Sequence, residues 1–291
     1  MKTKEMLKIS IVTPSYNQGQ YLEETIQSVL DQQYPNLEYI IMDGGSTDNS
    51  VDIIKKYESH LTHWESRPDD GQAYAISKGF NMATGDILAW LNSDDYYTPG
   101  TLHQVAELFT RDDLKIVFGE CDLYDQKSGK VKPSRVFEYA QSHIIELSDY
   151  IIQPSSFWTR KTYDLVGDLN VKLAYSFDWD WFIRAKRMGV QFQAVDKAFS
   201  VYRYHDQHKT GTGGDKRDME LANIYREYHS ELLSQKYLLR LTMQNKVLKA
   251  NKLNWIYSRI GLGGSIDARK PLYKRHFSEI SWQEFLGIVR M

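Results

Sequence analysis

The amino-acid sequence predicts an α/β protein: a mixed, mainly parallel sheet flanked by helices, with a helical C-terminal extension. Strand, loop and helix patterns alternate from the first residues to about position 110, an order typical of parallel sheets covered by helices. Beyond position 215, apolar residues recur at helical spacing among many lysines and arginines. We therefore expect a body of residues 1–214, with halves of about 1–110 and 111–214, and an extension of residues 215–291.

Three apolar segments of the first half have the pattern of buried strands, and each runs into a polar loop. They are KISIVTPSYN (8–17), LEYIIMDGGSTDNS (37–50) and DILAWLNSDD (86–95). The helices expected after the strands are QYLEETIQSVLDQ, VDIIKKYE and DGQAYAISKGFNMATG, with Ser50 as the N-cap of the second. Because the carboxyl ends of parallel strands meet at one edge, we expect Asp43 to converge there with Asp94 and Asp95.

The pattern becomes mixed after position 110. KIVFGECDLYD (115–125) and FQAVDKAFSVYRYH (192–205) are predicted strands, and SFDWDWFIRAKRMG (176–189) is a predicted helix that a glycine ends. The apolar stripe of this helix consists of Phe177, Trp181, Ala185 and Met188. Asp178 and Asp180 lie about 200° apart around it, so only one of them can face a given site. In the extension, GLGG at 261–264 interrupts the helical pattern.

Charge is distributed unevenly along the chain. The formal net charge is −2, but residues 235–291 carry a net charge of +8 and residues 1–234 a net charge of −10. The acidic body would repel phosphate, so nucleic acid is not an expected partner. The basic, aromatic-rich extension suits a surface near anionic lipid, but it also suits a helical cap with a solvated basic face. Both interpretations of the extension stay open.

Compartment and membrane signals are few. The chain has one cysteine, Cys121, which excludes an internal disulfide and suits a reducing compartment. The N-terminal MKTKEMLKIS lacks the apolar core of a signal peptide, and no run approaches the ~18 apolar residues of a membrane span. We expect a cytoplasmic protein, with peripheral contact at the inner face of the cell membrane as one role for the extension.

The ordered motifs resemble those of family-2 glycosyltransferases over roughly the first two thirds of the chain. Residues 9–50 resemble the nucleotide-binding half of that family, WLNSDD (90–95) is similar to its metal-binding DxD region, and FDWDWFIRAKRMG (177–189) to the segment with its catalytic base. The resemblance implies the GT-A fold and transfer of a sugar from a nucleotide diphosphate to an acceptor hydroxyl with inversion. Two positions depart from the pattern: Asn92 replaces the first Asp of DxD, and Phe177 replaces the acid before Asp178.

The resemblance implies a divalent cation, Mn²⁺ or Mg²⁺, that stabilises the diphosphate leaving group as a Lewis acid. We expect Asp95 to be the metal ligand. By resemblance, His205 closes over the diphosphate or the metal. Asp94 is assigned to the ribose, the sugar, or the metal through water. The alternative for the aspartate pair is a surface turn without a ligand. Zinc is not expected, because His205 and His208 lack the further ligands that it needs.

Further residues are expected to bind the donor. Asp43 would accept the imide N–H of uracil or an amino group of another base, and Tyr16 would stack on the base. Gln72 starts a helix whose N-terminal amides suit an anion. The expected donor-binding residues are Thr13, Pro14, Tyr16, Asp43, Asp70, Gln72, Asp94 and Lys209. For Tyr16 the alternative is packing, and for Asp70 it is helix capping. Asp48 is expected to support its loop or to cap the following helix.

Asp178 matches the general base of the family and would remove the acceptor proton. The leading hypothesis is an inverting, metal-dependent glycosyltransferase of surface glycan synthesis, with a UDP-sugar as leading donor and a glycan or lipid-linked sugar as acceptor. One alternative is a sugar nucleotidyltransferase, against which the first loop counts because it has no lysine or arginine. The other is an inactive sugar-nucleotide or glycan-binding module, against which the retained aspartates count.

Overall fold

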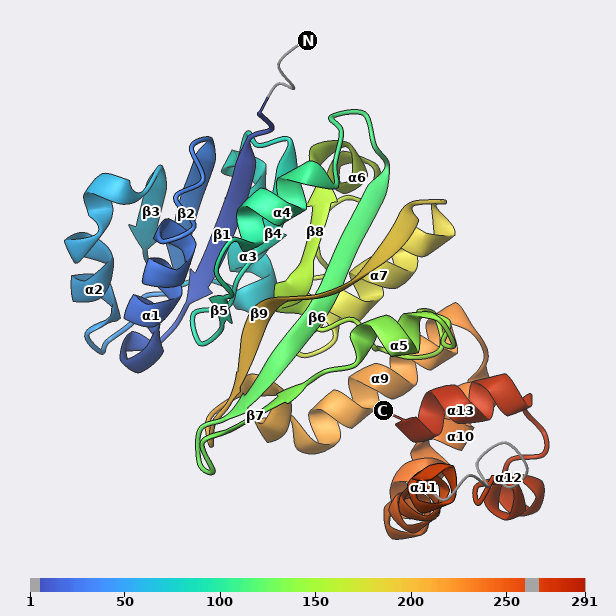
Figure 1. The fold of residues 1–291 in the computed structure, drawn as a ribbon. Helices are drawn as coiled ribbons and strands as arrows, with labels where there is room; N and C mark the ends of the chain where they lie inside the picture. The colour runs from blue at the N-terminus through green and yellow to red at the C-terminus, as the bar shows by residue number, and fades with distance from the viewer. Residues whose placement is uncertain (1–5, 260–266, 291) are drawn as a thin grey trace. The chain divides into compact units, whose positions relative to one another are not determined.

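The computed structural model describes residues 6–259 and 267–290 (Figure 1). The start of the N-terminal segment and the GLGG stretch, which the sequence singles out, lie outside the described residues. Among the residues that the structure describes, no helix has both the length and the apolar character needed to cross a membrane.

The chain divides into two compact units. The first contains the residues up to Ser142 together with Tyr150–Thr212, and the second contains His143–Asp149 together with the residues from Gly213 onward. The sequence predicts a single boundary at position 214. The structure places one after Thr212 and adds the short segment from the middle of the chain to the C-terminal unit.

The first unit is built on one mixed sheet, with nine strands in the part of the chain that the structure describes. The order is β3-β2-β1-β4-β8-β6-β9-β5, and β7 pairs with β6. The strands are β1 (Ile9–Ser15), β2 (Leu37–Asp43), β3 (His63–Ser66), β4 (Ile87–Trp90), β5 (Tyr96–Tyr97), β6 (Lys115–Asp125), β7 (Lys130–Pro133), β8 (Ser156–Thr159) and β9 (Gln191–Tyr204). Strands β1–β4 form parallel pairs, as do β6 and β9, whereas β8 runs antiparallel between β4 and β6.

All five segments with a predicted strand pattern form strands, namely β1, β2, β4, β6 and β9. The four strands without a sequence signal have four residues or fewer, which is too short for a periodic pattern. The mixed character of the sheet after β4 comes from β8, whose four residues are all buried, and from β5 and β7, which pair antiparallel with β9 and β6. The predicted mixed, mainly parallel sheet is therefore present.

Helices cover both faces of this sheet. They are α1 (Gly19–Leu30), α2 (Ser50–Lys56), α3 (Gln72–Met82), α4 (Thr101–Glu107), α5 (Val136–Ala140), α6 (Arg160–Val166), α7 (Phe177–Arg187) and α8 (Lys209–Thr212), with the short 3₁₀ helices η1 (Glu58–His60) and η2 (Gln153–Ser155). Because successive strand residues point to opposite faces, Ile9 and Ile11 pack in the apolar cluster that contains Leu22 of α1. Trp90 and Trp158 pack at 5.4 Å on the other face.

Two details of the predicted helices are wrong. Met188 does not complete the apolar stripe of α7: it is 49% exposed, because the helix ends at Arg187 and Gly189 turns the chain with a φ of 82°. Ser50 is the first residue of α2, and Asn49 is its N-cap.

The amino-terminal edge of the first strands holds a buried carboxylate, Glu38. Its Oε2 accepts from the Ser10 hydroxyl at 2.5 Å and the Thr84 N–H at 2.6 Å, and its Oε1 accepts from the Thr84 hydroxyl and from Lys8 Nζ, each at 2.8 Å. Burial by itself would raise the pKa of Glu38, but the hydrogen bonds from Lys8, Ser10 and Thr84 lower it to about 2. The group therefore ties β1, β2 and the approach to β4 together as an ionised carboxylate.

The second unit is helical, as the sequence predicts. Its helices are α9 (Gly214–Tyr228), α10 (Glu231–Thr242), α11 (Gln244–Arg259), α12 (Lys270–His276) and α13 (Trp282–Arg290). Aromatic residues form its core, with ring centroids 5.3 Å apart for Tyr225 and Tyr237 and 5.0 Å apart for Phe277 and Phe285. The Tyr225 hydroxyl donates to the carbonyl of Leu147 at 3.0 Å, which ties the segment His143–Asp149 to α9.

Candidate functional site

The loops that follow four neighbouring strands meet at the carboxyl-terminal edge of the sheet. Ser15 at the end of β1 pairs with Asp43 at the end of β2, which pairs in turn with Ser66 at the end of β3. Trp90 at the end of β4 pairs with Val12 of β1. The four loops therefore leave the sheet side by side, at the edge where open α/β sheets bind ligands.

Asp43 is held by its own loop. Its Oδ2 accepts from the N–H groups of Gly45 and Ser46 at 3.1 and 2.9 Å and from the Ser66 hydroxyl at 2.6 Å, while its Oδ1 accepts from the Ser46 hydroxyl at 2.6 Å. Gly45 has a φ of 82°, which favours glycine in this turn. Since a carboxylate offers about four lone-pair positions, Oδ1 keeps one position for a further donor.

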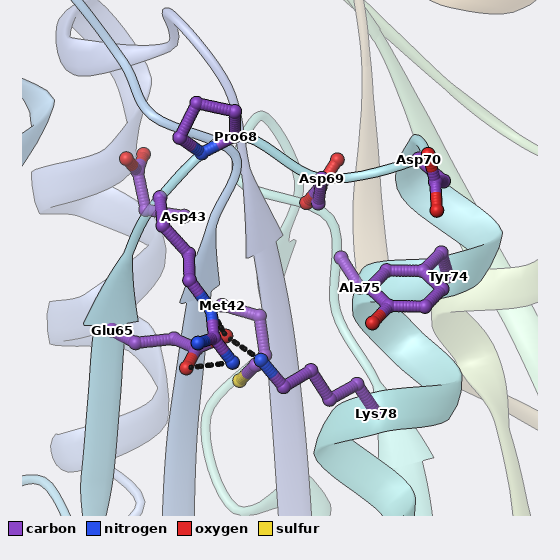
Figure 2. A pocket seen from close by; sticks show the side chains of 10 residues that line it. Met42, Asp43, Glu65, Pro68, Asp69, Asp70, Tyr74, Ala75 and Lys78 are labelled. Atoms are coloured by element: carbon purple, nitrogen blue, oxygen red, sulfur yellow. Dashed lines mark hydrogen bonds and ion pairs between the residues drawn. The ribbon is translucent and has the colours of Figure 1, made fainter.

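A cavity of about 240 Å³ opens beside Asp43 (Figure 2). It is lined by Met42, Asp43, Glu65, Arg67, Pro68, Asp69, Asp70, Tyr74, Ala75 and Lys78. Glu65 forms ion pairs with Lys78 and, at 3.0 Å, with Arg67 (Figure 2). Partial burial raises the pKa of the Asp69 carboxyl, and the charges of Asp43, Asp70 and Glu65 add to this effect. A cavity with this many carboxylate acceptors suits a ligand that presents N–H donors.

The three predicted residues of the first loop differ in exposure. Thr13 is buried, and its hydroxyl pairs with the Tyr39 hydroxyl at 3.1 Å; Pro14 is buried in β1. Tyr16 is 63% exposed. A Cβ atom at Gly44 would lie 3.3 Å from the Tyr16 ring and 3.2 Å from the Asp69 carboxylate. Gly44 thus lets Tyr16 lie beside a residue that lines the cavity, and Tyr16 is the member of this set placed to stack on a ligand.

Asp48 accepts hydrogen bonds from the first residues of two helices. Its Oδ2 accepts from the N–H of Gly19, the first residue of α1, at 2.9 Å, and its Oδ1 accepts from the N–H of Ser50, the first residue of α2, at 3.0 Å. Partial burial opposes ionisation, but the hydrogen bonds from Ser50 and Gly19 outweigh it and lower the pKa of Asp48. These contacts match the capping alternative for Asp48.

Asp94 and Asp95 are adjacent but lie in opposite environments. Asp95 is buried: its Oδ1 accepts from the backbone N–H of Arg203 at 3.1 Å and its Oδ2 from the Asn92 amide at 3.2 Å. Burial and then the Asp94 charge raise the pKa of Asp95 well above its usual range. The Asp94 carboxyl is 17% exposed and lies 3.1 Å from Nε2 of His205. The pair at the carboxyl edge therefore presents Asp94 rather than Asp95 to a ligand.

Arg203 of β9 fixes this turn, and the sequence does not single it out. Its side chain is buried, its Nε donates to the backbone carbonyl of Asp94 at 3.0 Å, and it forms an ion pair with Glu24 at 2.5 Å. Three tyrosine rings surround the guanidinium, with centroids at 5.0, 5.2 and 5.8 Å: Tyr21, Tyr96 and Tyr124. No local pattern could have indicated this group, because its members come from α1, β5, β6 and β9.

A chain of hydrogen bonds connects two predicted donor-binding residues to the turn. Lys209 Nζ donates to Gln72 Oε1 at 2.7 Å, Gln72 Nε2 donates to Asn92 Oδ1 at 2.8 Å, and Asn92 donates in turn to Asp95. An amide can accept and donate at the same time, whereas a carboxylate only accepts. This gives Asn92, the departure from the DxD pattern, a defined role. Asp70 instead lines the cavity of Figure 2.

The donor set around Asp94 fits a divalent cation only with help from a ligand. Among residues 6–259 and 267–290, no group of three or more His, Cys, Asp or Glu side chains could hold a metal ion. His208 Nδ1 contacts the carbonyl oxygen of His205. Asp94 and His205 supply two donors. Mg²⁺ or Mn²⁺ would take its remaining ligands from phosphate oxygens and water, as such cations do at phosphate sites.

The two aspartates of α7 have separate roles. Asp180 is buried and forms an ion pair with Arg184 at 3.0 Å. Asp178 is half-buried in the first turn, and one of its oxygens accepts from the N–H of Trp179 at 2.8 Å. The neighbouring Phe177 ring lies 5.4 Å from Lys209 Nζ, so the start of α7 borders the hydrogen-bonded chain described above. Asp180 is therefore engaged within its own helix, and Asp178 lies in the first turn of α7, next to Phe177.

Comparison with known proteins identifies the class to which this site belongs. Residues 10–167 match the model of glycosyl transferase family 2. This match covers more than half of the chain, which therefore belongs to glycosyl transferase family 2, as the motifs predict. The alternative of a sugar nucleotidyltransferase is not supported.

Relatives carry the same description. An uncharacterized glycosyltransferase of Nostoc is 32% identical over 161 residues, which are 52% of this chain and 48% of that protein. An uncharacterized glycosyltransferase of Rickettsia typhi is 27% identical over 82% of this chain and 74% of that protein. The putative teichuronic acid biosynthesis glycosyltransferase TuaG of Bacillus subtilis is 39% identical over 34% of this chain and 40% of that protein. The alignments thus span about half or less of the Nostoc and Bacillus proteins.

Solved structures show the same fold. TarS of S. aureus in complex with UDP-GlcNAc matches with a TM-score of 0.60 and 18% identity, over 98% of this chain and 79% of that one. The mannosyltransferase PcManGT from Pyrobaculum calidifontis, in complex with GDP-Man and Mn²⁺, matches with a TM-score of 0.64 and 16% identity, over 97% of this chain and 85% of that one. These likenesses confirm the predicted GT-A-like fold class.

Proposed function

We propose that this family-2 glycosyltransferase is an inverting, metal-dependent enzyme that moves a sugar from a UDP-sugar to an acceptor hydroxyl in surface glycan synthesis. The observation that carries the proposal is the Asp94–His205 pair at the carboxyl edge of the sheet. A cavity lined by carboxylates opens at the same edge. The Asp94–His205 pair would hold the diphosphate with its cation, and the cavity would hold the base.

Asp94 and His205 would hold the cation. The sequence predicts Asp95 for this role, but both oxygens of Asp95 are engaged by protein donors and its carboxyl is buried. When bound, Mn²⁺ or Mg²⁺ supplies Lewis-acid stabilisation of the charge that develops on the leaving diphosphate. Arg203 holds the backbone of the turn in place, and Lys209 adds a positive charge on the same side of the hydrogen-bonded chain.

The base would lie in the cavity of Figure 2. Asp43 Oδ1 has a lone-pair position for the imide N–H of uracil, and Tyr16 is exposed for stacking. Two structural neighbours carry UDP-GlcNAc and GDP-Man in their solved complexes, so the fold admits both bases. The choice of uracil rests on Asp43 having a single position left, because uracil presents one N–H there, whereas guanine presents an N–H and an amino group.

Asp178 would act as the general base toward the acceptor hydroxyl. It lies in the first turn of α7, where the helix dipole favours the ionised carboxylate that a base requires. The acceptor proposed is a glycan or a lipid-linked sugar, in keeping with the teichuronic acid assignment of the relative TuaG.

The test is calorimetric binding of UDP, GDP, CDP and dTDP, each with Mn²⁺ and with EDTA. We expect UDP to bind in the presence of metal and Asp94→Ala to weaken this binding about a hundredfold while the unfolding temperature stays unchanged. Asp95→Ala should instead lower the free energy of unfolding by about 2–3 kcal/mol, because it leaves the Arg203 and Asn92 donors unpaired in the interior. If no diphosphate binds, or if EDTA has no effect on binding, the proposal of a metal-dependent donor site is wrong. The alternative of an inactive binding module is then favoured.

A further inference from the structure

The exposed face of α11 combines large apolar side chains with positive charge. Four apolar side chains of this helix are exposed, namely Leu248 (56%), Leu253 (37%), Trp255 (53%) and Ile256 (37%). Between Gln244 and Arg259 the helix carries three lysines and one arginine, all exposed, and no aspartate or glutamate. Single exposed apolar residues are ordinary on protein surfaces, but four on one helix indicate a binding surface.

Helical geometry gathers these side chains into two adjacent stripes. Leu248, Lys252, Trp255 and Arg259 follow one another at i, i+4, i+7 and i+11, and Lys249, Leu253 and Ile256 form the stripe beside them. The Arg259 guanidinium lies 5.0 Å from the centre of the Trp255 ring. The face thus alternates apolar and cationic groups along about three turns of helix.

The opposite face of α11 is occupied within its own unit. Val247 and Ala250 are buried, and the Asn251 amide donates to the carbonyl of Val289 in α13 at 3.2 Å. The helix is therefore anchored by one side, and Leu248 and Trp255 lie on the other, exposed side.

We propose that the exposed face of α11 binds the surface of an anionic lipid bilayer. Tryptophan and leucine insert at the boundary between headgroups and acyl chains, while lysine and arginine interact with anionic headgroups. A second copy of the chain fits poorly, because pairing two such faces would bring eight cationic groups together without a counter-charge. The proposal goes beyond the donor site and does not depend on it.

The first test is sedimentation of the full chain with vesicles of phosphatidylcholine, with and without phosphatidylglycerol. We expect binding to the anionic vesicles that weakens as salt is added. Replacing Lys246, Lys249 and Lys252 by Gln should lower the partition constant about a hundredfold, since each basic residue near such a surface contributes roughly fivefold. Trp255→Ala should lower it about tenfold through lost apolar burial.

The matched control carries the same charge change on the first unit. Lys127, Lys130 and Lys132 are exposed at the β6–β7 hairpin, and their triple replacement by Gln should leave vesicle binding unchanged. Circular dichroism and thermal unfolding check that each variant is folded. Absence of wild-type binding to anionic vesicles, or equal loss in the hairpin variant, overturns the proposal.

A label on the helix tests the location directly. Cys121 is fully buried, so a cysteine introduced as Asn245→Cys, on the exposed side of α11, can be labelled selectively with an environment-sensitive fluorophore. Its emission should shift to the blue with anionic vesicles, whereas the same label at Lys130→Cys should not respond. An unchanged α11 label overturns the proposal. So does a dimer in sedimentation velocity that Trp255→Ala dissociates, because a second copy would then cover this face.

Discussion

The two edges of the parallel part of the sheet place buried carboxylates in opposite electrostatic states. At the amino edge, Glu38 receives four hydrogen bonds, one of them from the ammonium of Lys8, and its pKa falls to about 2. At the carboxyl edge, burial and then the charge of Asp94 raise the pKa of Asp95, and its two neutral donors do not offset them. At the amino edge the chain itself stabilises the ionised carboxylate of Glu38, whereas at the carboxyl edge burial and the neighbouring Asp94 disfavour ionisation of Asp95.

This difference separates carboxylates that belong to a functional site from carboxylates that stabilise the fold. A carboxylate that its own protein neutralises stabilises the fold, and a cluster that stays under-compensated is suited to a cation or to N–H donors of a ligand. On this criterion Asp94 belongs to the site and Glu38 to the scaffold. Substitutions at the carboxyl edge should therefore change activity or binding, and substitutions at the amino edge should change stability.

The largest effect is expected at α7, where two aspartates two residues apart provide a matched pair. Asp178→Asn should lower kcat about a thousandfold with unchanged affinity for UDP, because the general base is lost while the donor site is intact. Asp180→Asn should lower the free energy of unfolding by about 1–2 kcal/mol, since Arg184 loses its buried partner. Sugar-transfer kinetics and chemical denaturation separate the two. Equal turnover in both variants would exclude Asp178 as the base.

The substitution Arg203→Met tests whether the turn at Asp94 and Asp95 depends on the buried guanidinium of Arg203. Methionine keeps most of the apolar stem but removes the hydrogen bond to the Asp94 carbonyl, the contacts with three tyrosines and the pair with half-exposed Glu24. We expect a loss of about 2–3 kcal/mol in the free energy of unfolding and weaker metal-dependent UDP binding. Urea denaturation and calorimetry measure both, with the exposed Arg275→Met as the control. Unchanged UDP binding would limit Arg203 to a role in stability.

The smallest effect is expected at the amino edge, and it depends on pH. The pKa of Glu38 lies near 2 in the folded chain, against 4.5 without the fold, so its contribution is complete above pH 4.5 and is lost as the pH falls toward 2. Glu38→Gln should lower the free energy of unfolding by about 2 kcal/mol at neutral pH, without affecting the affinity for UDP. It should also reduce the loss of stability as the pH falls from 4.5 toward 2. The exposed Glu227→Gln serves as control in urea denaturation across this range. An unaltered acid profile would contradict the lowered pKa.

Much of the carboxyl edge was predictable because it depends on local order. Strand patterns that end in polar loops place Asp43 and Asp94 at one edge of a parallel sheet, since such strands all point the same way. The motif resemblance predicts the family, and residues 10–167 confirm it. The capping role of Asp48 also follows from its position before a helix.

Only the tertiary structure determines which carboxylate of the Asp94–Asp95 pair faces outward and which groups contact each of them. Asp94 and Asp95 are neighbours with the same side chain; the sequence assigns the metal to Asp95, whereas the geometry favours Asp94. Asp95 accepts a hydrogen bond from Arg203, which is 108 residues away in the chain. It accepts another from Asn92, which is connected through Gln72 to Lys209.

The same division holds for α11 in the second unit. Its composition indicates a basic, aromatic helix, but only packing against α13 determines that Trp255 and Leu248 face outward while Val247 does not. Periodicity and strand order act over a few residues or along one sheet, so the sequence alone determines them. Hydrogen-bond partners and exposed faces depend on segments far apart in the chain, so only the folded structure determines these.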